Sequence, residues 1–190
     1  PVVEGDRVER WLHGALTLGL APLLLVQGRW VRRRTPVLPE PPGPRAGVIG
    51  QGPVLRLLIV GDSSAAGVGT AHQDEALSGR LTQALSRDFT VHWRLQACTG
   101  HKLADVRAAV RGLPAEPFDV VVVAVGVNDA TGRTHMAHWL HGLQSLVTEL
   151  KQRHQAQQVI LSALPPVHLF PALPQPLRWY LGRCATRLDR

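Results

Sequence analysis

The feature that most constrains the fold is a nearly unbroken apolar run at residues 118–125, Phe-Asp-Val-Val-Val-Val-Ala-Val. An amphipathic helix or a half-exposed strand would alternate apolar and polar residues with its own period, and this run has no such period. Continuous runs of valine are typical of strands buried on both faces, as in a parallel sheet covered by helices. The run therefore predicts a central strand of an α/β domain.

The chain from residue 54 onward alternates between strand and helix patterns around that run. Strands separated by helices are joined by right-handed crossovers, which produce a parallel sheet with helices on both faces. We therefore predict an α/β fold with three layers, α/β/α, and a flavodoxin-like parallel sheet. The expected strands are residues 54–60, 89–95, 118–125 and 158–163, and the expected helices are residues 75–87, 103–112, 135–154 and 177–190.

Residues 1–34 form a separate amino-terminal segment with an apolar centre and a basic flank. The 18 residues 11–28 contain no Asp, Glu, Lys or Arg, and four arginines follow within residues 29–34. As a helix they would reach about 27 Å, slightly short of a bilayer core of about 30 Å. A membrane anchor, an interfacial helix and a helix packed on the globular domain all remain open. If the segment spans a membrane, the arginines place the rest of the chain on the cytoplasmic side; otherwise we expect a cytoplasmic protein.

Residues 35–53 contain six prolines and four glycines. No helix or central strand tolerates that density, so we expect a semi-rigid linker. The globular domain is then expected at residues 54–190. Because the chain begins with Pro1 and reaches Arg190 inside an expected helix, we expect it to be a piece of a longer protein.

Charge and cysteine content exclude several classes of protein. The chain has 190 residues and a formal net charge of +7, from 21 basic and 14 acidic residues. Much of the basic charge lies near the amino end, so we do not expect nucleic-acid binding. Cys98 and Cys184 are too few for a disulfide scaffold and match no metal-ligand spacing.

Three polar loops follow three successive expected strands. They are residues 61–69, Gly-Asp-Ser-Ser-Ala-Ala-Gly-Val-Gly, residues 98–100, Cys-Thr-Gly, and residues 126–129, Gly-Val-Asn-Asp. Because the carboxyl ends of parallel strands meet at one edge of a sheet, we expect these loops to lie together. A serine on a tight strand-to-helix turn, with an asparagine amide and a glycine N–H beside it, provides a hydroxyl among three oxyanion donors. That combination fits acyl transfer.

The same three loops resemble the motif blocks of the SGNH hydrolases (GDSL lipases and esterases). Residues 61–63, Gly-Asp-Ser, are similar to the first block, residues 99–100 to the second, and residues 126–129 to the third. Either tripeptide alone is weak, but the two together with the glycine between them are specific. The likeness covers residue 54 onward.

The resemblance implies an SGNH-type fold and ester hydrolysis through an acyl-enzyme. Ser63 would be the nucleophile, and its own N–H, the N–H of Gly100 and the side chain of Asn128 would form the oxyanion hole. The substrate would be a small-molecule ester, with no metal and no cofactor.

The chain departs from the family at the catalytic base. The family completes its triad with Asp-x-x-His near the carboxyl end, and no aspartate in this chain has histidine three places on. Without a base, a serine hydroxyl is a poor nucleophile. We therefore expect the 190 residues alone to be inactive, either because the motif lies beyond Arg190 or because the protein binds acyl or glycan groups without catalysis. His101 and His168 are conceivable substitute bases, although ordinary loop histidines are the simpler interpretation.

Other interpretations of the loops remain open at this stage. Residues 61–69 resemble neither a dinucleotide fingerprint nor a Walker loop, so a nucleotide-binding Rossmann-like domain is the weaker alternative. We expect Asp62 and Asp129 to hydrogen-bond the backbone of their own turns rather than to bind a metal.

Further side chains have a functional and a structural interpretation. The apolar residues of 165–176 could line an acyl pocket or simply pack on the next helix. We expect Cys98 to be a small packing residue. His135, His138 and His141 fall off the apolar face of their expected helix, so we expect solvated histidines rather than metal ligands.

Overall fold

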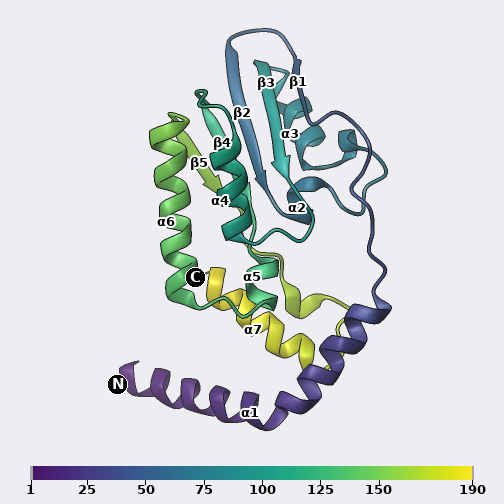
Figure 1. Cartoon of the computed structure of the whole chain (residues 1–190), viewed down its shortest axis with the longest axis vertical. Coiled ribbons are helices and arrows are strands. Elements are labelled where there is room, and N and C mark those ends of the chain that lie inside the picture. Colours follow the sequence, from purple (N-terminus) through teal and green to yellow (C-terminus); the bar gives the residue numbers. More distant parts are fainter. Residues whose placement is uncertain (1, 190) are drawn as a thin grey trace. The chain divides into compact units, whose positions relative to one another are not determined.

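A computed structural model gives the structure of residues 2–189, with the side chains described from residue 18 onward. It contains a five-stranded sheet of order β1-β3-β2-β4-β5 (Figure 1). The strands β2 to β5 pair in parallel, and β1 pairs antiparallel with β3. Their bounds are β1 Ala46–Ile49, β2 Val54–Gly61, β3 Thr90–Ala97, β4 Val120–Ala124 and β5 Gln158–Leu161. The expected α/β fold is confirmed, but the sheet is mixed rather than wholly parallel.

The order of the parallel strands determines where a ligand can bind. Across the sheet the four parallel strands follow the order β3-β2-β4-β5. The second parallel strand of the chain, β3, thus lies on one side of the first, β2, and the third and fourth lie on the other side, as in the flavodoxin-like arrangement. The chain therefore reverses direction across the sheet between β2 and β4. A crevice at this switch point, beyond the carboxyl ends of the strands, is where such sheets bind ligands.

The antiparallel strand β1 lies inside the segment that we expected to be a linker. Its residues, Ala46–Ile49, contain none of the six prolines, which come before and after it. A strand of four residues at a sheet edge can form beside such proline-rich stretches because only one side of it needs ladder hydrogen bonds. The N–H of Leu95 also donates to the carbonyl of Arg45, at 2.7 Å, so the pairing begins just before β1. Residues 46–49 are therefore part of the sheet.

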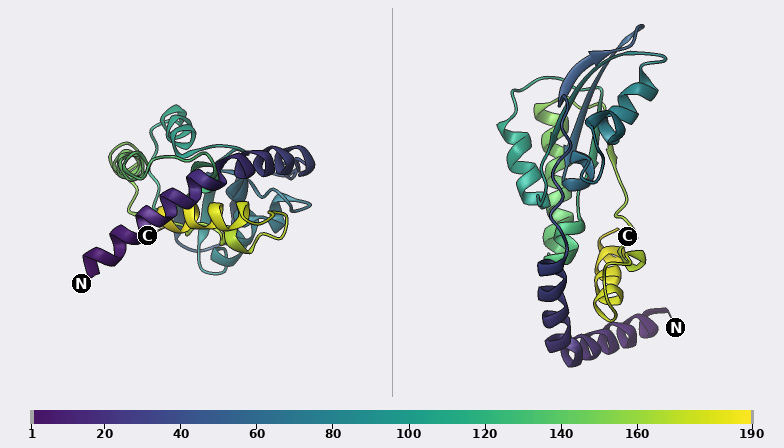
Figure 2. Two further views of the ribbon diagram at one scale, coloured as in Figure 1. Left: turned by 90° about the horizontal axis from the view of Figure 1, so that it is seen from below. Right: turned by 90° about the vertical axis from the view of Figure 1, so that its right-hand side faces the viewer.

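Helices cover both faces of the sheet (Figure 2). One layer contains α2 (Ser63–Ala66), the 3₁₀ turn η1 (Gln73–Glu75) and α3 (Leu77–Leu85). The other contains α4 (Leu103–Gly112) and α6 (Met136–Arg153), and the short helix α5 (Val127–Thr131) follows β4. The expected helix at 103–112 agrees with α4 at both ends.

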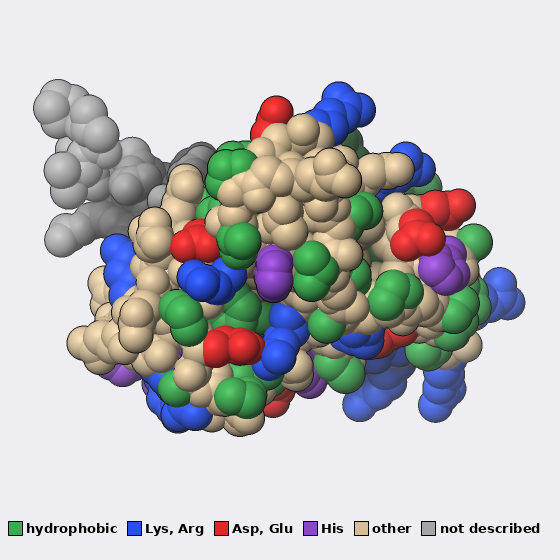
Figure 3. Space-filling model, turned by 90° about the horizontal axis from the view of Figure 1, so that it is seen from above, with side chains coloured by type: hydrophobic (Ala, Val, Ile, Leu, Met, Phe, Trp, Pro, Cys, Tyr) green, Lys and Arg blue, Asp and Glu red, His purple; other side chains and the backbone are tan. Residues whose placement is uncertain are grey.

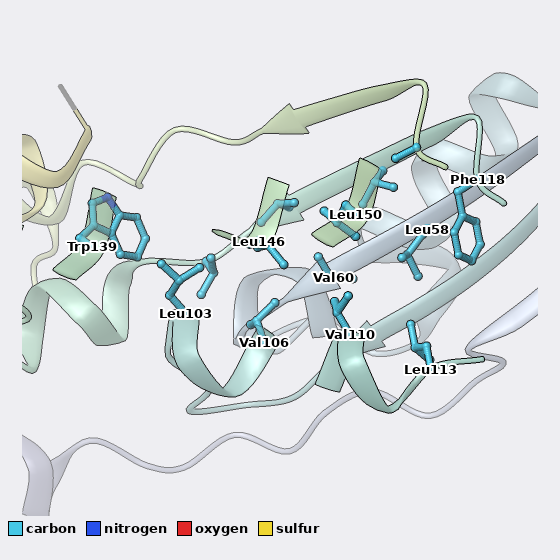
Figure 4. Packing of buried hydrophobic residues seen from close by; sticks show 14 residues of the cluster. Leu58, Val60, Leu103, Val106, Val110, Leu113, Phe118, Trp139, Leu146 and Leu150 are labelled. Atoms are coloured by element: carbon cyan, nitrogen blue, oxygen red, sulfur yellow. The ribbon is translucent and has the colours of Figure 1, made fainter. Parts of the chain in front are cut away.

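The central strands β2 and β4 are buried on both faces of the sheet, which explains why their sequences are almost wholly apolar. Leu57, Leu58, Ile59 and Val60 of β2 are all completely buried. Leu58 and Val60 pack under α4 and α6, whereas Leu57 and Ile59 belong to a second cluster on the α2 and α3 side. The valines of β4 alternate between the same two clusters. Figure 4 shows the larger cluster, in which Leu146 and Leu150 of α6 meet Val106 and Val110 of α4.

The chain divides into two compact units: residues 38–165 with 184–189, which contain the sheet, and residues 2–37 with 166–183. The second unit contains α1 (Val2–Arg34), the 3₁₀ turn η2 (Val167–Leu169) and the first turns of α7 (Leu177–Asp189). Within it, Gln27 of α1 donates from Nε2 to the carbonyl of Gln175 at 2.7 Å and accepts from the N–H of Leu177 at 3.1 Å.

The amino-terminal segment was considered above as a membrane-spanning helix. Across residues 2–189, none of the helices combines the length and the apolar character needed to cross a bilayer.

On the face toward the amino ends of the parallel strands, acidic and basic side chains are interspersed rather than gathered by sign (Figure 3).

Candidate active site

Ser63 is the first residue of α2 and follows directly from the central strand β2. The N–H of Asp62 continues the pairing with β4 by donating to the carbonyl of Ala124 at 3.0 Å, and the helix then begins at Ser63. The helix has only four residues because Gly67, at φ +86°, ends it. Ser63 is half-buried at the carboxyl end of the sheet. Its hydroxyl therefore lies on a sharp strand-to-helix turn next to the switch point.

The carboxylate of Asp62 holds that turn together. Its Oδ1 accepts hydrogen bonds from the N–H of Ser64 at 2.9 Å and from the Ser64 hydroxyl at 2.8 Å. Asp62 is buried, and these bonds offset part of the cost of removing a carboxylate from water, while its Oδ2 has no hydrogen-bond partner among residues 18–189. The expected role of Asp62 in its own turn is confirmed. Since this carboxylate already occupies the N–H of Ser64, and since α2 is a single turn, the phosphate-binding interpretation of the loop has little support.

Gly100 lies in the loop between β3 and α4. It has φ +85°, a conformation that favours glycine, and a Cβ placed on it would meet no atom within 4 Å. The loop begins beside the Ser63 turn, because the N–H of Cys98 donates to the carbonyl of Gly61 at 3.3 Å. Cys98 itself is exposed, so its expected packing role is wrong. The strand ends at Ala97, and the cysteine falls in the open part of the loop.

Asn128 is on α5, directly after β4, and its side chain reaches the Gly100 loop. Its Nδ2 donates a hydrogen bond to the carbonyl of His101 at 2.9 Å. The preceding turn depends on Gly126, at φ +139°, where a Cβ would come within 2.9 Å of both Leu164 and Trp139. The side chain of Asn128 is half-buried and carries a second N–H besides the one that binds His101.

Asp129 has a different role from the one we expected. Its Oδ2 accepts from the N–H of Leu103 at 2.9 Å, and its Oδ1 accepts from the hydroxyl of Thr134 at 3.0 Å. Leu103 is the first residue of α4. Asp129 therefore caps the helix that follows the neighbouring β3–α4 loop and does not act only within its own turn. Burial raises the pKa of the Asp129 carboxyl above its ordinary value, against the lowering effect of these hydrogen bonds.

These contacts gather the three expected loops at one edge of the sheet. Asn128 and Asp129 connect the β4–α5 loop to the β3–α4 loop, and Cys98 connects the latter to the end of β2. The arrangement places the hydroxyl of Ser63, the backbone of the Gly100 loop and the amide of Asn128 around the switch point. It is suited to acyl transfer, in which an oxyanion needs several donors.

The histidines considered above as bases or as metal ligands differ in exposure and in location. His101 is half-buried, and its Nδ1 is buried with no partner among the described residues. His168 is exposed on η2, in the other compact unit. His135, His138 and His141 are exposed on or next to α6. Among the side chains of residues 18–189, no group of three or more His, Cys, Asp or Glu is arranged to hold a metal ion.

One contact of the site was missed by sequence reasoning. Glu40, in the proline-rich segment before β1, accepts a hydrogen bond from the N–H of Thr99 at 2.6 Å. A carboxylate among prolines and glycines carries no signal of its own, and the two residues are 59 positions apart.

Comparisons with known proteins agree with the fold. The model of the GDSL-like lipase/acylhydrolase family matches residues 59–190. A curated GDSL-like esterase of Mycobacterium tuberculosis is 28% identical to this chain over an alignment 193 residues long, and the alignment includes 93% of this chain. The match covers 61% of that relative, so the chain spans less than two thirds of its length.

Two solved structures share the fold at low identity. The extracellular lipase of Streptomyces rimosus has a TM-score of 0.53 at 16% identity, with 70% of this chain and 72% of the lipase covered. A member of the G-D-S-L lipolytic protein family from Veillonella parvula has a TM-score of 0.52 at 12% identity, with 70% of each chain covered.

Proposed function

This chain belongs to the GDSL-like lipase/acylhydrolase family, and from that premise we propose that it is an ester hydrolase whose nucleophile is Ser63. Gly100, through its backbone N–H, and Asn128, through its side-chain amide, stabilise the oxyanion together with the N–H of Ser63. The substrate is a small-molecule ester, and the reaction uses no metal or cofactor.

The observation that carries the proposal is the bond from Asn128 to the carbonyl of His101. It brings the amide of the β4–α5 loop against the residue that follows Gly100. With one Nδ2 hydrogen engaged there, the other is available for an oxyanion. The Ser63 turn is joined to the same loop through Cys98, so all three groups belong to one edge of the sheet.

The chemistry requires two acyl transfers. The Ser63 Oγ attacks the carbonyl carbon of the ester while a base takes the hydroxyl proton, and the carbonyl oxygen becomes an oxyanion held by the three donors. The oxyanion collapses, the alcohol leaves with that proton, and the acyl group remains on Ser63. Water then attacks the acyl-enzyme, and the carboxylic acid and free Ser63 are released.

The base is the one group of this mechanism for which the chain offers no motif, since Asp-x-x-His does not occur in it. Loss of the base in a serine hydrolase leaves only about 10³–10⁴-fold acceleration over water. We therefore expect the 190 residues alone to hydrolyse an activated ester very slowly. If they turn over normally, His101 is the first residue to test as base, because its buried Nδ1 has no hydrogen-bond partner within residues 18–189.

The experiment is hydrolysis of p-nitrophenyl acetate by the complete protein from its natural gene, compared with its Ser63→Ala variant. We expect Ser63→Ala to lower kcat by roughly 10³-fold or more. Ser145→Ala is the matched control: the Ser145 hydroxyl donates to the carbonyl of His141 on the outer helix α6, so turnover should be unchanged. Circular dichroism checks that both variants are folded.

Two outcomes would contradict the proposal. Full activity in Ser63→Ala would exclude this serine as nucleophile. A folded complete protein that hydrolyses no ester but binds acylated ligands would favour the non-catalytic binding alternative.

A further inference from the structure

The segment before β1 contacts the loop that carries Gly100. The Oε1 atom of Glu40 accepts two hydrogen bonds from Thr99, one from its N–H at 2.6 Å and one from its hydroxyl at 2.8 Å. The other carboxylate oxygen, Oε2, pairs with Nη1 of Arg45 at 2.8 Å. The Nη2 atom of Arg45 donates in turn to the carbonyl of Ala97. Glu40 and Arg45 thus bind the chain on both sides of Cys98.

From these contacts we infer that Glu40 is a positioning residue for the oxyanion hole, and that it acts by holding the peptide of Gly100 in place. The inference rests on the proposed function, because it assigns to Glu40 the task of fixing a donor of that site. Arg45 supports it by orienting the Glu40 carboxylate.

The Gly100 loop needs such support because it has little packing of its own. Residues 98–100 are all exposed, and a Cβ placed on Gly100 would meet no atom within 4 Å beyond its chain neighbours. A backbone N–H stabilises an oxyanion only if its direction is fixed before the reaction. Exposed glycine loops without side-chain packing do not supply that rigidity.

The hydrogen bonds supply it from both sides of the glycine. Thr99, immediately before Gly100, is held by Glu40, and His101, immediately after it, is held by Asn128. The two neighbours of the donor are therefore anchored to two different parts of the sheet domain. Removing Glu40 takes away the side-chain anchor of Thr99, the residue next to the donor, although the N–H of Cys98 still holds the start of the loop to the carbonyl of Gly61.

The charge of Glu40 is compatible with a nearby oxyanion because Arg45 balances it. Burial by itself raises the pKa of Glu40, but hydrogen bonds from Thr99 and Arg45 lower it, and the net pKa is below its ordinary value. The carboxylate is therefore ionised at neutral pH and presents an ion pair rather than a net negative charge to the loop.

The test compares Glu40→Ala and Glu40→Gln in the complete protein. We expect Glu40→Ala to lower kcat by about 10–100-fold with KM changed less than about threefold, since loss of a whole oxyanion donor costs about 10²–10³. Glu40→Gln keeps an oxygen that accepts from Thr99, so it should recover most of kcat. In parallel, amide hydrogen exchange of Thr99 and Gly100 should accelerate in Glu40→Ala and much less in Glu40→Gln.

Glu116→Ala is the matched control for Glu40→Ala. Glu116 pairs with Arg94 of β3 at 2.8 Å, the same length as the Glu40–Arg45 pair and at similar exposure, but it does not touch the Gly100 loop. Its loss should leave both kcat and the exchange of Thr99 and Gly100 unchanged. Equal losses in Glu40→Ala and Glu116→Ala would mean a general effect on stability and would overturn the inference.

The remaining outcomes also decide the question. If Glu40→Ala does not fold, Thr99→Val, which removes only the hydroxyl bond to Glu40, should still lower kcat and raise exchange. Unchanged kcat and exchange in a folded Glu40→Ala variant would overturn the inference. If the wild-type protein hydrolyses no ester, the proposed function fails, and the exchange rates alone then decide whether Glu40 holds the loop.

Discussion

The side-chain amide of Asn128 donates to the backbone carbonyl of His101, with 2.9 Å between Nδ2 and the oxygen. The two residues belong to loops that follow β4 and β3, which are separated in the sheet by β2. The bond therefore passes across the end of β2, the strand that leads into the Ser63 turn. A second bond, from the N–H of Leu103 to Asp129, joins the same two loops. This pair of contacts organises the candidate active site.

Asn128→Ala should lower kcat of the complete protein by about 10²–10³, with a small effect on KM, because it removes a donor that acts on the oxyanion. Loss of its single bond to His101 should lower the free energy of unfolding by about 1 kcal/mol. Steady-state kinetics and urea unfolding measure the two effects. Gln144→Ala, which removes an exposed amide on α6, should change neither. A fall in stability without a fall in kcat would contradict the assigned role.

The bond itself can be observed directly, because Asn128 is the only asparagine in the 190-residue sequence. A chain labelled with ¹⁵N-asparagine should give one pair of side-chain NH₂ signals. We expect one of the two protons to exchange more slowly with solvent than the other, since only one is bonded to His101. Equal, rapid exchange of both would show that the contact does not persist in solution.

Asp129→Asn should change how stability depends on pH. The pKa of Asp129 is raised in the folded protein, so between 3.8 and that higher value the native state binds more protons than the unfolded state. Stability must therefore fall as pH rises through this window. The asparagine variant does not titrate, so wild type should lose stability relative to it as pH rises. Urea unfolding of both proteins across acidic to neutral pH measures the difference, and parallel curves would contradict the prediction.

Gly61→Ala should be severely destabilising, by at least about 3 kcal/mol, because a Cβ there would overlap the carbonyl oxygen of Ala124 in the neighbouring strand. Gly61 and Ala124 are register partners, so β2 and β4 would have to separate just before Ser63. Gly112→Ala at the end of α4 meets nothing within 4 Å and should cost nothing or be slightly stabilising. Thermal unfolding compares the two; a Gly61→Ala protein as stable as wild type would contradict the strand pairing.

Local patterns in the sequence were sufficient for the elements buried on both faces. The valines of β4 and the apolar residues of β2 predicted central strands because burial on two faces leaves no polar position in the pattern. The edge strand β1 was missed for the opposite reason. Its four residues have no period of their own, and they become a strand only by pairing with β3, more than 40 residues away.

The same division holds for the site. By itself the sequence determined the three loops, their place after successive strands, and the residue types that acyl transfer needs, since each is carried by a few adjacent residues. Only the tertiary structure decided what holds these residues in place: Asp129 capping α4, Asn128 reaching His101, and Glu40 bonded to Thr99. These bonds join residues 26 to 59 positions apart, and such distances along the chain leave no periodic trace because nothing short of the folded sheet brings the partners together.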